Sequence, residues 1–202
     1  MNFVKTLLAS AALAVSFGAS ATVTGSLGGG AGSFLALSQA GLSNGAVATL
    51  NGGTVYNSDR PFADIPAGSV FGNNFLAVGP TAGSPSMLTF ATAVNYVSFL
   101  WGSPDTYNQL TVNSTGGGSQ VFTAAGLNFA QTNGNQGFSQ YVQFAGVSGS
   151  QITSLVFTNV PSVDAFEVAN FTITPVPEPE TYALMLAGLG AMAMFARRRR
   201  AE

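Results

Sequence analysis

Carboxylates are the side chains of this sequence that are available for acid–base chemistry. Histidine and cysteine are absent, so Ser-His-Asp and Cys-His catalysis, zinc sites and c-type haem attachment all lack essential residues. The only lysine, Lys5, lies in a segment that we expect to be removed, and Schiff-base and P-loop chemistry are lost with it. The acidic side chains between residues 22 and 175 are Asp59, Asp64, Asp105, Asp164 and Glu167.

Two carboxylates at a suitable separation can hydrolyse a glycosidic bond. The sequence alone does not show that any two of these five converge, and most surface carboxylates are simply solvated. We therefore expect a protein that is not an enzyme. Glycoside hydrolysis is kept as the least favoured alternative.

Charge is scarce in the central part of the chain. Arg60 is the only positive side chain between residues 22 and 175, against five negative ones, which gives a net charge of −4. Without a basic patch the protein has nothing to neutralise phosphates, so we expect no nucleic-acid partner. About 150 residues suffice for one domain with its own core, which no disulfide can reinforce.

The C-terminal stretch has the pattern of a membrane anchor. No charge falls between Tyr182 and Ala196, and the positive cluster Arg197, Arg198, Arg199 and Arg200 follows directly. At about 1.5 Å per residue this run predicts a single transmembrane helix, with the arginines as a membrane stop on the cytoplasmic side. The residues before Pro175 are then expected outside the cytoplasm.

The order of these features resembles the PEP-CTERM sorting signal of Gram-negative bacteria. Val176-Pro-Glu-Pro is followed by the apolar run and then by arginines. The resemblance implies that an exosortase in the inner membrane reads Pro177, Glu178 and Pro179, removes the helix, and passes the protein to the cell surface or biofilm matrix. A plain single-span anchor with a Pro-rich stalk is the alternative.

The N-terminus predicts export as well. Lys5 supplies a positive charge, Thr6 to Phe17 an apolar core, and Ala19-Ser-Ala21 a small-residue cleavage site. This is the pattern of a secretory signal peptide over residues 1–21. It leaves an ectodomain over residues 22–174 and a sorting segment over residues 175–202.

Short apolar runs separated by Gly, Asn and Pro predict that the ectodomain is all-β. Residues 94–101 are apolar on both alternating faces, which predicts a central strand, and residues 87–90 predict a separate short one. Leu110 and Val112 alternate with polar residues, and the Gly-rich run 114–118 predicts a hairpin to residues 120–124. We expect an antiparallel, jelly-roll-like β-sandwich.

The segment Phe99-Leu-Trp-Gly-Ser-Pro-Asp-Thr-Tyr-Asn-Gln-Leu resembles a stretch found in exosortase-dependent surface proteins, where it lies in a lectin-like β-sandwich. Trp101, Asp105 and Tyr107 are candidates for a sugar platform, with the ring stacked on a pyranose and the carboxylate holding hydroxyls. The alternative is that Trp101 belongs to the core and Asp105 caps a turn by bonding its own backbone.

Residues 165–173 resemble the closing strand of many such sandwiches, in which an Asp often precedes the Asn. Ala169 occupies that position here. In the family the carboxylates around this strand suit calcium. With one ligand missing, we expect no cofactor, with calcium at Asp164 or Glu167 as the alternative and a solvated strand edge as the simpler account of Glu167.

The sequence thus predicts an exported, non-enzymatic β-sandwich that is transiently anchored in the membrane and then displayed at the cell surface or in the extracellular matrix. We expect a structural or exopolysaccharide-associated role. The main alternative is a carbohydrate-binding module.

Overall fold

The computed structural model describes residues 22–175 together with residues 189 and 192. The predicted signal peptide, the Pro-Glu-Pro motif, and the arginine cluster lie outside the described residues, as does most of the predicted transmembrane helix. Among the residues that are described, no helix has the length and apolarity needed to cross a membrane.

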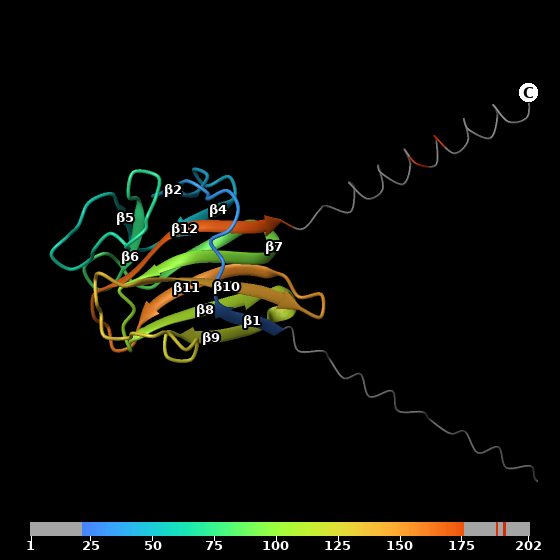
Figure 1. The fold of residues 1–202 in the computed structure, drawn as a ribbon. Helices are drawn as coiled ribbons and strands as arrows, with labels where there is room; N and C mark the ends of the chain where they lie inside the picture. Colours follow the sequence, from blue (N-terminus) through green and yellow to red (C-terminus); the bar gives the residue numbers. More distant parts are fainter. Residues whose placement is uncertain (1–21, 176–188, 190–191, 193–202) are drawn as a thin grey trace, which may run out of the picture.

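Twelve antiparallel strands and one 3₁₀ turn make up the body (Figure 1). The prediction of an all-β antiparallel fold is confirmed, whereas the jelly-roll order stays a prediction. The elements are β1 (Thr22–Leu27), β2 (Leu37–Ser38), β3 (Gly41–Leu42), β4 (Ala48–Asn51), β5 (Thr54–Tyr56), β6 (Phe75–Val78), β7 (Ser86–Gly102), β8 (Asn108–Ser114), η1 (Thr115–Gly117), β9 (Ser119–Thr123), β10 (Ser139–Val147), β11 (Ile152–Asn159) and β12 (Phe166–Pro175).

Strand β7 holds the body together because it belongs to both layers. Its first half pairs with β4 and β11, and its second half pairs with β10 and β12. The chain reverses near Val94, which pairs with Ile152 on one side and Pro175 on the other. One layer therefore runs β2-β3-β4-β7-β11-β8-β9, and the other joins β1, β10, β7, β12, β6 and β5.

Aromatic rings fill the space between the layers. Phe99 on β7 meets Phe157 on β11 edge to face at 5.7 Å, and Phe122 on β9 meets Phe144 on β10 at 4.9 Å. Buried aromatic pairs of this geometry add stabilisation beyond the area that they bury. The main core is thus an apolar layer that continues from β9 to β12, and a smaller apolar cluster around Phe75 lies apart from it.

Several sequence expectations are confirmed by burial. Residues 97–101 of β7 are buried on both faces, as expected of a central strand. Leu110 and Val112 face the core, and β8 and β9 form the predicted hairpin, with Asn113 opposite Ser119. The two strands expected over residues 87–90 and 94–101 are one strand, because hydrogen bonding continues through the reversal.

The expectation that Glu167 lies at a solvated strand edge is wrong. Glu167 is only 4% exposed. At this point β12 is flanked on both sides, since Glu167 stands opposite Ala77 of β6 and Gly102 of β7. Contacts above the sheet bury the side chain, since the Asp64 backbone amide and the Ser103 hydroxyl both bond the Glu167 carboxyl group.

The two ends of the body contain different parts of the chain. Thr22 of β1 and Pro175 of β12 lie at one end, on the right in Figure 1. The opposite end is formed by the loops around Asp64, Asp105 and Asp164. Strand β12 connects the two over ten residues, a length of about 30 Å.

Candidate functional site at the acidic end

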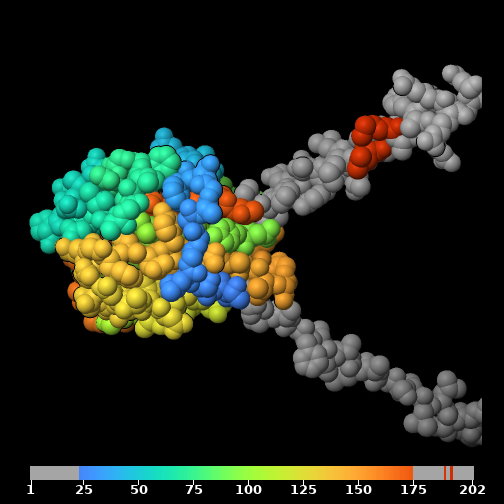
Figure 2. All heavy atoms as spheres, in the orientation of Figure 1, coloured from blue at the N-terminus to red at the C-terminus, as the bar shows by residue number. Residues whose placement is uncertain are grey.

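All five carboxylates of residues 22–175 gather at the end far from Pro175, which we call the acidic end. The pairing of Gly102 with Glu167 brings the loops after β7 and before β12 together, and the segment containing Asp59 and Asp64 lies beside them. That segment belongs to the teal surface that projects on the left in Figure 2. The set therefore comes from three separate stretches of the chain.

Glu167 is the buried member of the set. The hydroxyl of Ser103 donates a 2.8 Å hydrogen bond to its Oε2. Burial raises the pKa of Glu167 to about 8, assisted by the charges of Asp105 and Asp64, while the Ser103 hydroxyl and the Asp64 backbone amide oppose the rise. The carboxyl group is consequently neutral over most of the physiological pH range.

The other carboxylates lie nearer the surface. Burial raises the pKa of Asp105, and burial together with the charge of Asp59 raises the pKa of Asp64. Asp164 accepts hydrogen bonds from the Thr81 backbone N–H at 3.1 Å and from its hydroxyl at 2.6 Å. Burial is thus the shared cause of the raised pKa values of Asp64 and Asp105.

Tyr107 bridges two of the acidic loops. Its hydroxyl donates to the carbonyl oxygen of Asp164 at 2.8 Å. Burial, reinforced by the neighbouring carboxylates, raises the pKa of the Tyr107 hydroxyl, so it remains a donor. Tyr107 and Asp105 thus lie close together, and both are partly buried.

Trp101 does not join them at the surface. Trp101 is fully buried. Its ring stacks on Phe166 at a centroid distance of 4.3 Å, and its Nε1–H donates a 3.4 Å hydrogen bond to Oδ1 of Asn108. The ring therefore presents no face to a sugar. The turn that follows is capped by Asn108, whose Oδ1 accepts the Asp105 backbone N–H at 2.7 Å, rather than by the Asp105 side chain.

A buried pair of asparagines supports the acidic end, and sequence reasoning missed it. Asn108 donates to Oδ1 of Asn159 at 3.0 Å and to the carbonyl of Ala165 at 3.3 Å, while Asn159 donates to the carbonyl of Val78 at 3.0 Å. These bonds join β8, β11, β6 and the start of β12. The only signal was the position of Asn108 inside the segment that resembles exosortase-dependent proteins.

An apolar tip projects beside the acidic end. Phe71 is 52% exposed and has a φ of 56°, an uncommon conformation for an aromatic residue. Its loop is fastened by buried Asn170, which accepts the Val70 backbone N–H at 2.9 Å and donates to the Gly68 carbonyl at 2.8 Å. Asn170 also donates to the hydroxyl of Tyr141 at 2.8 Å. We call residues 66–74 the Phe71 loop.

The arrangement suits binding better than catalysis. Exposed carboxylates accept hydrogen bonds from hydroxyl groups, and an exposed ring stacks on an apolar face. Glu167, the carboxyl group with the raised pKa that a general acid requires, is enclosed by its own chain. Within the described residues, no three acidic side chains form a set that could hold a metal ion, and calcium at Asp164 or Glu167 stays a prediction.

Comparison with known proteins gives a match at the C-terminal end of the chain. A family model described as the PEP-CTERM protein-sorting motif matches residues 175–200, so the motif begins at the last residue of β12. This confirms the resemblance inferred from sequence. The motif implies exosortase-dependent export, with a transient membrane anchor before processing to the cell surface. Neither the curated proteins nor the solved structures gave a match to this chain.

Proposed function

We propose that this protein is a non-enzymatic β-sandwich of the cell surface, with a structural or exopolysaccharide-associated role. The single observation that carries the proposal is the separation of its two ends. The sorting motif begins where β12 ends, at Pro175, and the carboxylates lie at the opposite end of the body. A body held through Pro175 presents its acidic end outward.

Carbohydrate binding is the second candidate, and the Phe71 loop is the observation that favours it. An aromatic ring that is half exposed and held in an unfavourable backbone conformation contributes little to the core, which points to a role in binding. Asp64 lies earlier in the same connection between β5 and β6. An exposed ring suits the apolar face of a pyranose.

The test is co-sedimentation of the protein with the polysaccharide of its native matrix, together with a glycan array. We expect wild-type protein to associate, and Phe71→Ala to weaken the association about tenfold, equivalent to about 1.4 kcal/mol. Val121→Ala is the matched control, because Val121 is 57% exposed on β9. The same mixtures are assayed for reducing ends, and we expect none to be released.

Failure of the wild-type protein to associate with any polysaccharide would remove the exopolysaccharide-associated role. Equal weakening by Phe71→Ala and Val121→Ala would remove the Phe71 loop as the binding element. Release of reducing ends that is abolished by Glu167→Gln or Asp105→Asn would show instead that the body is a glycoside hydrolase.

A further inference from the structure

The end of the body opposite the acidic end carries no charge in the described part of the chain. All five carboxylates lie at the acidic end, and Arg60 lies there too, with its guanidinium 4.6 Å from the ring centre of Tyr56. These six residues are the whole charged content of residues 22–175. The end that contains Thr22, Val94 and Pro175 is therefore built from neutral side chains.

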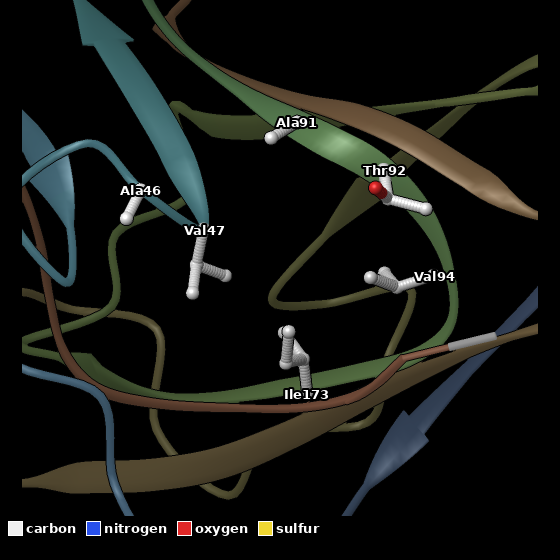
Figure 3. A pocket seen from close by; sticks show the side chains of 6 residues that line it. All are labelled: Ala46, Val47, Ala91, Thr92, Val94 and Ile173. Carbon is white, nitrogen blue, oxygen red and sulfur yellow. The ribbon is translucent and has the colours of Figure 1, made fainter. Parts of the chain in front are cut away.

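This uncharged end contains an apolar hollow, shown in Figure 3. The reversal of β7 forms one wall, the loop before β4 another, and the last part of β12 the floor. The hollow has a volume of about 170 Å³, comparable to the roughly 150 Å³ cavity that binds benzene in another protein. Its lining residues are Ala46, Val47, Ala91, Thr92, Val94 and Ile173.

The hollow is accessible from outside. Ala46, Ala91 and Thr92 are exposed at its rim, and Val47 and Ile173 are half-buried. Thr92 supplies the one side-chain polar group of the lining. An apolar chain entering the hollow displaces water from carbon surface and leaves no charged group without solvent, so its entry is favourable.

The length of the chain places the hollow near the membrane. Ile173 is two residues from Pro175, and only residues 176–181 separate Pro175 from the uncharged run at 182–196. Six residues span at most about 20 Å when fully extended. While the sorting motif still provides the membrane anchor that it implies, the uncharged end therefore lies within about 20 Å of the bilayer surface.

We propose that the uncharged end docks on the bilayer before processing, with a lipid acyl chain in the hollow. The distribution of charge supports this orientation, because docking by this end leaves five carboxylates about 30 Å from the lipid phosphates. The partner is a phospholipid. At least one of its acyl chains has a saturated segment that can leave the bilayer interior and enter the hollow.

The absence of cysteine allows a direct test with the full-length chain in vesicles of phosphatidylethanolamine and phosphatidylglycerol. A fluorophore is attached to Thr92→Cys at the rim of the hollow, or to Ser162→Cys, which is exposed at the acidic end. Lipids brominated in the middle of the acyl chain serve as quenchers. We expect at least fivefold stronger quenching at position 92 than at position 162.

A second substitution separates docking from mere tethering. Ala46→Asp adds a carboxylate at the exposed rim and is expected to reduce quenching at position 92 to the level at position 162. Thr49→Asp on the exposed face of β4 is the matched control and should leave it unchanged. Equal quenching at positions 92 and 162, or quenching at 92 that Ala46→Asp does not alter, would overturn the proposal.

Discussion

Replacing Trp101 with alanine is expected to lower the free energy of unfolding of the body by about 3–5 kcal/mol. The residue is fully buried, stacks on Phe166 and meets Phe129 edge to face at 5.2 Å. Its removal leaves a cavity at the junction of the two layers, and it deprives Asn108 of a hydrogen-bond donor. Few single substitutions in this core should cost more.

The measurement is urea unfolding followed by circular dichroism, since Trp101 is the only tryptophan and its fluorescence is lost with it. Tyr107→Phe is the companion variant. It removes only the hydroxyl that bonds Asp164, so a loss of about 1 kcal/mol is expected. If Trp101→Ala were nearly neutral for stability yet abolished glycan binding, the ring would have to be a sugar platform after all.

The stability of the body is expected to fall as the pH rises from about 5 to 8. The pKa of Glu167 is raised from an ordinary value of 4.5 to about 8 in the folded protein. Between these values the folded state holds a proton that the unfolded state has lost, so each rise of one pH unit costs up to roughly 1.4 kcal/mol. This contribution is fully present below pH 4.5 and is lost once the pH exceeds 8.

Glu167→Gln isolates the effect of this group. Glutamine keeps the shape and accepts the Ser103 hydroxyl, but it does not titrate, so unfolding measured from pH 5 to 9 should show a much shallower slope. Asp64 and Asp105, whose pKa values are also raised, contribute in the same direction but remain in both proteins. A wild-type slope that equals the Glu167→Gln slope would show that Glu167 ionises normally.

Local patterns in the sequence were sufficient to predict several of the strands. The alternation at Leu110 and Val112 reports directly which face of β8 is buried, and the Gly-rich run after it has the residues that a tight connection needs. The double-sided apolarity of residues 97–101 likewise reports a strand that is covered on both faces. Such signals depend only on near neighbours along the chain.

The acidic end was not predictable in this way, because it depends on pairing between distant segments. Glu167 is buried because the segment that carries Asp64 and the turn that carries Ser103 enclose its carboxyl group, and nothing near it in the sequence encodes those contacts. The two segments that resemble exosortase-dependent proteins were identified separately. The structure brings them together through Ser103 with Glu167 and Asn108 with Ala165.

The burial of Trp101 also depends on contacts that the local sequence does not encode. A tryptophan beside Asp105 and Tyr107 is a residue set that would suit a sugar platform, although the sequence favoured a place for it in the core. Whether a side chain at the end of a strand is covered depends on what packs on that face, which here involves the distant residues Phe129 and Phe166. The structure instead leaves the Phe71 loop as the exposed aromatic element of this region.

The most direct test of the account is the intact mass of the protein recovered from its native cell. The account predicts a surface-associated species that lacks residues 1–21 and the C-terminal segment with Arg197–Arg200, and that is detectably lighter than the 20.5 kDa translation product. Recovery of the complete 202-residue chain from the cytosol, with both ends in place, would contradict it.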